Sequence, residues 1–203
     1  MLLAFDTSTA ACTAALFDGS GACVDRRDEL IGRGHAERLV PMIAELLDGR
    51  SADRILVGVG PGSFTGIRVA IAAAHGLAIG WDAQLAGMSS LALLAAGTDW
   101  AGEVAVAVAG GHGELFVQQF AGDTREPTSA VANLSPADAA GRIGANLVIG
   151  SGARLLVDAR GWGEARDASP SAADALKIPD DLRSLEAKPL YGRAPDARVP
   201  KAA

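Results

Sequence analysis

The segment from Ile55 to Ile79 constrains the fold more than any other part of the chain. An apolar run, Ile55 to Val59, breaks into a glycine-rich loop at residues 60–66, and a run of Ile, Val, Ala and Gly residues follows. This order predicts a strand, a glycine loop and a helix over residues 66–79. Proteins hold phosphates with such an arrangement, because free backbone N–H groups and a helix N-terminus attract anions.

The loop lacks the residues of the common nucleotide motifs. No Lys follows Gly66, as a Walker A loop requires, and no acidic residue stands where a ribose would be bound. Close packing between a strand and a helix is therefore the stronger interpretation of the loop. Asp6, Thr7 and Ser8 follow the first predicted strand, where they can hold Mg²⁺ or phosphate or bond to their own turn. The candidate phosphate or nucleotide loop comprises Asp6, Thr7, Ser8, Gly60, Gly62, Ser63, Thr65 and Gly66.

Composition and motif spacing exclude several classes of function. A net charge of −6 argues against a protein that binds nucleic acid by itself. Two cysteines, Cys12 and Cys23, cannot form a disulfide scaffold or a four-ligand zinc site. No two of the three histidines are three or four residues apart, and no GxSxG motif occurs. These patterns leave no paired histidine face for a metal ion and no serine-nucleophile motif.

The order of predicted elements indicates an α/β fold. Residues 1–98 predict three antiparallel strands followed by helix, strand, helix, strand and helix, with one amphipathic helix over residues 35–47. Composition changes at Gly97-Thr98-Asp99-Trp100, and residues 99–203 repeat the pattern in shortened form. We expect an N-terminal lobe at 1–98 and a smaller C-terminal lobe at 99–203 that is weakly patterned from Asp158 onward.

The predicted helix 66–79 carries apolar residues on two sides. One stripe can pack on the helix's own sheet, and the second, rich in small residues, allows another helix to approach closely. That helix belongs either to this chain or to a partner, and the pattern favours neither. The two stripes are Ile67, Ala70, Ile71, Ala74 and Ala78, and Val69, Ala72, Ala73, Gly76 and Gly80.

The chain shows no sign of membrane targeting. No segment is expected to reach the length of a membrane span, and the N-terminus MLLAFDTST has no basic region that would begin a signal peptide. These observations predict a cytoplasmic protein with no membrane partner.

Four segments together resemble the TsaB (YeaZ) family. They are LLAFDTSTAACTAAL at the start, GHAERLVPMI at 34–43, VGVGPGSFTGIRVAIAAAHGLA at 57–78 and PLYGRAPDA near the end. The resemblance implies an ASKHA-type fold, as in actin, sugar kinases and Hsp70, made of two ribonuclease-H-like lobes with the second reduced. Residues 121–185 carry little of it.

The resemblance also implies a non-catalytic role in tRNA modification, with no catalytic residues, no metal site and no cofactor. TsaB-type proteins pair with TsaD, which transfers threonylcarbamoyl to the adenosine next to the anticodon of ANN-decoding tRNAs, and the ATPase TsaE joins the pair. The family implies a homodimer when TsaD is absent and contact with tRNA only through the complex. It also places the partner surface on the two N-terminal helices. The residues expected there are Leu39, Met42, Ile43, Val69, Ala72, Ala73 and Gly76.

The chain departs from the catalytic pattern of TsaD-like proteins. Ser90 and Leu94 stand where TsaD carries a metal-binding HxxxH, and Val108 stands where a second phosphate motif has Asp. Ala109 stands where the family often has an Asp, ahead of Gly113-Glu114. Three alternatives remain distinct: an accessory subunit, an ASKHA-type enzyme that uses ATP and Mg²⁺, and a peptidase, which no motif supports.

Overall fold

The first lobe is built on a mixed five-stranded sheet. A computed structural model describes residues 1–191, and within them the strands of this sheet lie in the order β3-β2-β1-β4-β5. β1 is antiparallel to β2 and parallel to β4, and β4 is parallel to β5. The strands span Leu2–Asp6 (β1), Ala11–Phe17 (β2), Cys23–Leu30 (β3), Arg54–Gly58 (β4) and Gln84–Met88 (β5).

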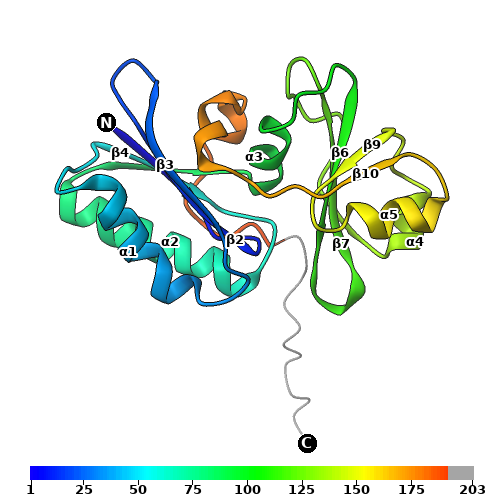
Figure 1. The fold of residues 1–203 in the computed structure, drawn as a ribbon, viewed down its shortest axis with the longest axis horizontal. Coiled ribbons are helices and arrows are strands. Elements are labelled where there is room, and N and C mark those ends of the chain that lie inside the picture. Colours follow the sequence, from blue (N-terminus) through cyan, green and yellow to red (C-terminus); the bar gives the residue numbers. More distant parts are fainter. Residues whose placement is uncertain (192–203) are drawn as a thin grey trace, which may run out of the picture.

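Two helices cover one face of this sheet (Figure 1). α1, His35–Leu47, has the bounds that its amphipathic pattern predicts. α2, Phe64–Trp81, begins two residues earlier than predicted, because the Ser63 side chain accepts a hydrogen bond from the Gly66 N–H and caps the helix there. The predicted strand, loop and helix are therefore confirmed.

The second lobe has a sheet with the order β10-β9-β6-β7-β8 and helices on its outer face (Figure 1). Three of its strands are only three residues long, which fits the predicted reduction of this lobe. Together the two lobes confirm the expected α/β, ASKHA-type architecture. The elements span Glu103–Ala109 (β6), Gly111–Gly113 (η1), Leu115–Ala121 (β7), Ala132–Leu134 (β8), Pro136–Ala140 (α4), Leu147–Ile149 (β9), Ala153–Arg160 (α5) and Glu164–Arg166 (β10).

A shared core lies between the two sheets. α3, Ser90–Ala96, and the short helix η2, Ala172–Lys177, fill this space with buried aliphatic side chains. Phe17 contributes from the first sheet and Phe120 from the second. The lobes are therefore packed against each other through α3 and η2 on the faces opposite α1, α2 and α5.

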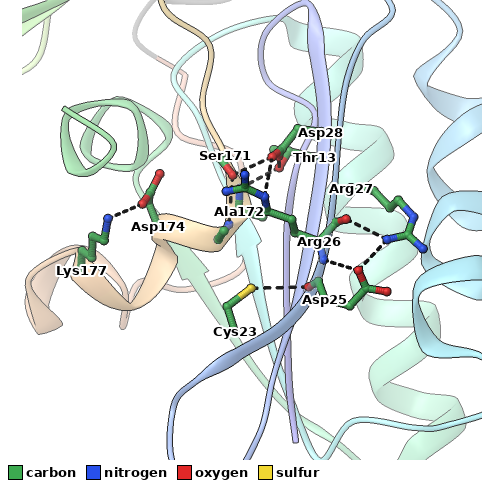
Figure 2. Close-up of polar contacts among 11 residues, drawn as sticks. Thr13, Cys23, Asp25, Arg26, Arg27, Asp28, Ser171, Ala172, Asp174 and Lys177 are labelled. Atoms are coloured by element: carbon green, nitrogen blue, oxygen red, sulfur yellow. Dashed lines mark hydrogen bonds and ion pairs between the residues drawn. The ribbon is translucent and has the colours of Figure 1, made fainter. Parts of the chain in front are cut away.

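Residues 171–191 return from the second lobe to the first. The buried Thr13 side chain accepts a hydrogen bond from the Ala172 N–H (2.7 Å) and donates one to Asp28 (2.5 Å), and Ser171 also donates to Asp28 (2.9 Å) (Figure 2). A further short helix, η3, Asp180–Leu182, follows. The lobe boundary at residue 98 stays a prediction. Residues 192–203, and with them Gly192 to Ala197 of the PLYGRAPDA segment, lie outside the described residues.

Candidate functional site

Asp6 is the last residue of β1, and its carboxylate points into the protein. Its Oδ1 accepts hydrogen bonds from the Ser8 N–H and the Ser8 hydroxyl, both at 2.7 Å. Its Oδ2 accepts one from the Ser90 hydroxyl at 2.5 Å, and the Ser90 oxygen accepts the Gly60 N–H at 3.1 Å. The Asp6 side chain is fully buried. The carboxylate therefore joins β1 to α3 and, through Ser90, to the glycine loop.

Gly58 at the end of β4 and two glycines of the loop allow this segment to pack closely on the end of β1 and the turn that follows it. A Cβ at Gly58 would overlap the Asp6 carboxylate, one at Gly62 the Ser8 carbonyl, and one at Gly66 the Thr7 carbonyl. Two hydrogen bonds join the same segments: Ser63 N–H to the Ser8 carbonyl (2.6 Å) and the Thr7 hydroxyl to the Gly66 carbonyl (2.7 Å). Of the two interpretations of the loop, close packing is therefore the one that the structure supports.

A cleft of about 1280 Å³ lies beside the loop, between the lobes. The N-terminal ends of α1 and α2 border it on one side, and the turn at Gly111 and His112 borders it on the other. Among the candidate phosphate-loop residues, Asp6, Thr7 and Gly60 do not line this cleft. The members that do are Ser8, Gly62, Ser63, Thr65 and Gly66.

The three positions that the sequence resemblance aligns with TsaD ligand positions carry side chains that serve hydrogen bonding or core packing. Ser90 is bonded to Asp6, and Leu94 and Val108 are buried in the core between the sheets. Within residues 1–191, no three His, Cys, Asp or Glu side chains lie close enough to hold a metal ion.

The prediction that α1 contributes Leu39, Met42 and Ile43 to a partner surface is wrong. Leu39, Met42 and Ile43 are at most 2% exposed, because the single apolar stripe of α1 packs on the sheet and on α2. A protein that docks on α1 would meet its outer side chains, of which Val40 is 54% exposed.

The expected partner residues on α2 lie at or near the surface. Ala72 and Gly76 are exposed, and Val69 and Ala73 are half-buried. Ile79, farther along the helix, is 84% exposed. A Cβ at Gly76 would have no neighbour within 4 Å, so this face of the helix is open.

α2 also corrects the expectation about membrane-length segments. It has 18 residues, a mean hydropathy of 1.3 and only 28% of its residues buried, so by length and composition alone it could cross a membrane. Its buried side packs on the sheet of the first lobe together with α1. An apolar helix that keeps so much exposed surface is typical of a helix that a partner covers.

One group of residues at the site was not foreseen. The Phe64 and Tyr191 rings stack at the N-terminal end of α2, with Arg68 against them, although Tyr191 is 123 residues from Arg68 in the chain. The one sequence feature that could have indicated this group is Tyr191, the only tyrosine in the sequence, which lies within the PLYGRAPDA segment. Nothing in local periodicity joins that segment to α2.

Comparison with known proteins places the chain in a family. Residues 28–147 match the TsaD family, described as tRNA N6-adenosine threonylcarbamoyltransferase. The chain is 37% identical over 131 residues to the tRNA threonylcarbamoyladenosine biosynthesis protein TsaB of Escherichia coli K12, a match that covers 60% of the chain and 55% of the relative. It is 42% identical over 100 residues to TsaB of Haemophilus influenzae, covering 46% of the chain and 41% of that protein. The chain thus spans about half the length of the curated relatives it matches.

Two solved structures from Pseudomonas aeruginosa match over nearly their full lengths. One, described as similar to peptidase YEAZ, has a TM-score of 0.80 and 32% identity, and the match covers 95% of this chain and 99% of that one. The chain belongs to the TsaB (YeaZ) family. The second, YeaZ, has a TM-score of 0.76 and 30% identity, covering 94% and 98%. The TsaB resemblance drawn from the sequence is therefore confirmed.

The family match covers part of the cleft between the lobes. The TsaD family match extends over Ser90, Leu94 and Val108, the three positions for which the sequence resemblance implies a loss of metal or phosphate ligands. A cleft lies between the lobes, and Asp6, which does not line it, is hydrogen-bonded within the protein.

Proposed function

We propose that this chain is a non-catalytic accessory subunit of the complex that transfers threonylcarbamoyl to the adenosine next to the anticodon of ANN-decoding tRNAs. It binds a TsaD-type subunit, and through it a TsaE-type ATPase. The TsaB relatives, which are described as tRNA threonylcarbamoyladenosine biosynthesis proteins, support the pathway.

The exposed apolar surface of α2 carries the proposal. Ala72 and Gly76 lie four residues apart on one side of a helix that is mostly unburied. Small side chains let a second helix approach closely, so a helix of the TsaD-type subunit can cover this face. α1 lies alongside and adds Val40. In the absence of TsaD a second copy occupies the same face as a homodimer.

Our proposal that this chain has no catalytic activity is based on the burial and hydrogen bonding of the Asp6 carboxylate. A carboxylate that binds a metal ion must present its oxygens to the ion, whereas the Asp6 oxygens are buried and take three hydrogen bonds from the protein. The chain works in the cytoplasm without its own cofactor and meets tRNA only through the complex, in keeping with its net charge of −6.

Co-elution with the TsaD-type subunit of the same organism tests the partner. The wild-type chain should form a stable complex in gel filtration, and tRNA modification by TsaD and TsaE types should require it. Gly76→Arg should abolish the complex and the homodimer, because a long charged side chain would stand on the contact face. Ala73→Arg should act in the same direction.

Ala159→Arg, at an exposed position of α5 in the second lobe, is the matched control and should leave both assemblies intact. If Gly76→Arg co-elutes with the TsaD-type subunit as the wild type does, the α2 assignment is wrong.

The alternative, an enzyme that uses ATP and Mg²⁺, is favoured by one observation, the size of the cleft between the lobes. Calorimetry with ATP and Mg²⁺ distinguishes this enzyme from the accessory subunit. A submicromolar affinity together with hydrolysis by the isolated chain would contradict the accessory role. A peptidase has no comparable support, since among residues 1–191 no metal-binding group of side chains is found.

A further inference from the structure

The last described residues form a strap along the first lobe. We use this term for residues 185–191. Leu185 pairs with Gly87 at the free edge of β5, His75 of α2 hydrogen bonds to the Ala187 carbonyl (3.3 Å), and the Leu190 N–H donates to the Val59 carbonyl (2.8 Å). The strap therefore follows α2 toward its N-terminal end and is held along its length by backbone hydrogen bonds and one bond from the His75 side chain.

At that end three side chains form a compact group, which we call the aromatic latch: Phe64, Arg68 and Tyr191. The rings of Phe64 and Tyr191 are stacked, with centroids 5.3 Å apart and planes at 28°. The Arg68 guanidinium carbon lies 3.7 Å from the Phe64 centroid, and its Nε donates to the Tyr191 hydroxyl at 3.0 Å. The three side chains hold one another in place before any partner arrives, which lowers the entropy cost of binding.

The latch is exposed although two of its three side chains are large aromatic rings. Phe64 is 54% exposed, Tyr191 43% and the adjacent Leu190 45%. Aromatic residues make up only 4% of the chain, so two stacked rings at the surface stand out from an aliphatic protein. Tyr, Phe and Arg are the residue types that gather at the centres of protein interfaces, where burial of large side chains contributes most of the affinity.

The charge of Arg68 indicates the chemistry of the partner. Within the described part of the chain, Arg68 forms no ion pair with a carboxylate. Its Nε is used by Tyr191, while no acceptor among residues 1–191 is recorded for its two Nη groups. A guanidinium held over a ring can offer these donors to a planar acceptor such as a carboxylate.

We propose that the aromatic latch is a contact site for the TsaD-type subunit, which places an Asp or Glu side chain on Arg68 and apolar side chains on Phe64 and Tyr191. The inference rests on the proposed function and extends its partner face. Arg68, Ala72 and Gly76 follow one another at intervals of four on α2, so one partner surface covers all three. A single guanidinium matches a single carboxylate. An RNA backbone would need several cations, and this chain is acidic.

Calorimetric affinity for the TsaD-type subunit, measured at low and at physiological salt, tests the latch. Arg68→Glu should weaken binding by roughly tenfold or more, because it brings two like charges together in a buried contact. Arg68→Lys keeps the charge but loses the planar fork, so a loss of roughly threefold or more is expected. Binding by the wild type should weaken with salt, and binding by Arg68→Glu should weaken less.

Arg154→Glu is the matched control, because Arg154 is a highly exposed arginine on α5 of the second lobe. It should bind as the wild type does. Thermal unfolding of each variant shows whether the fold is kept, and Arg68→Lys answers the question if Arg68→Glu fails to fold.

The outcomes separate this inference from the proposed function. If the wild type fails to bind the TsaD-type subunit, both the proposed function and the proposed role of the latch are wrong. If the wild type binds and the Arg68 variants bind equally well, only the latch is wrong. If the variants change the affinity of the assembled complex for tRNA but not the affinity between subunits, the occupant is RNA and the inference is overturned.

Discussion

At the scale of single residues, Asp6 has the strongest influence on the site. Its carboxylate accepts the Ser8 N–H and hydroxyl and the Ser90 hydroxyl in a position without solvent access. Asp6→Ala would leave these buried donors without partners, so it should lower the free energy of unfolding by about 2–4 kcal/mol. Chemical denaturation measures this loss.

Asp99→Ala, at an exposed position, is the control and should change stability by less than about 0.5 kcal/mol. Thermal unfolding of the wild type with and without Mg²⁺ tests the alternative that Asp6 binds a metal ion. A rise in melting temperature with Mg²⁺ that disappears in Asp6→Ala would mean that the carboxylate binds a metal ion.

The two cysteines should differ in reactivity. Burial, with a smaller effect of Glu29, raises the pKa of the Cys12 thiol from 9.0 to about 11, whereas Cys23 is exposed on β3. A thiol reagent at pH 8 should therefore modify Cys23 in the native protein and Cys12 only after unfolding. Mass spectrometry of the labelled peptides checks the order, and equal labelling of both in the native state would contradict it.

The same pKa shift predicts how stability depends on pH. The Cys12 pKa is higher in the folded than in the unfolded state, so its contribution is complete below pH 9 and is lost between pH 9 and about 11. The loss is at most about 1.4 kcal/mol per pH unit. Cys12→Ala should remove this part of the slope in denaturation curves measured across that range.

At the scale of elements, sequence patterns located α1 and α2 but did not reveal what covers them. The apolar stripe of α1 predicts its bounds correctly, yet Leu39, Met42 and Ile43 face the core and not a partner. Periodicity shows that one side of a helix is apolar, and the neighbouring element decides whether that side is inside. The glycine loop was ambiguous for a similar reason, since the close approach of Thr7 and Ser8 depends on a distant segment.

Two glycines on α2 give a matched pair of predictions. Gly66→Ala places a methyl group against the Thr7 carbonyl and should destabilise the protein by about 1–3 kcal/mol. Gly76→Ala meets open space in the middle of the helix and should stabilise it by about 0.5–1 kcal/mol. Denaturant unfolding of both variants measures the sign of each change in the free energy of unfolding. Equal effects of the two substitutions would show that the loop does not pack on the turn after β1.

At the scale of the whole molecule, contacts between the lobes were beyond the reach of sequence patterns. The two-lobe α/β architecture followed from the order of elements and the family resemblance, and it is confirmed. The segment after Asp158 was expected to be weakly patterned, but residues 171–191 pack on the first lobe through η2 and the strap. Several of its anchor points are hydrogen bonds to residues more than a hundred positions away, such as Ala172 to Thr13, and local spacing in the sequence does not indicate them.

Thr13 should therefore control how firmly the returning segment is attached. Its hydroxyl accepts the Ala172 N–H and donates to Asp28 in a fully buried position (Figure 2). Thr13→Val keeps the shape of the side chain but leaves the Ala172 N–H without a partner, at a cost of about 1–3 kcal/mol. Hydrogen exchange should accelerate at Ala172 and through η2, because local opening of the segment becomes easier. Thr128→Val, whose hydroxyl donates to Glu103 at the surface, is the matched control and should leave exchange in η2 unchanged. If Thr13→Val also leaves it unchanged, apolar packing of η2 alone holds the segment, and the hydrogen bond to Thr13 is dispensable.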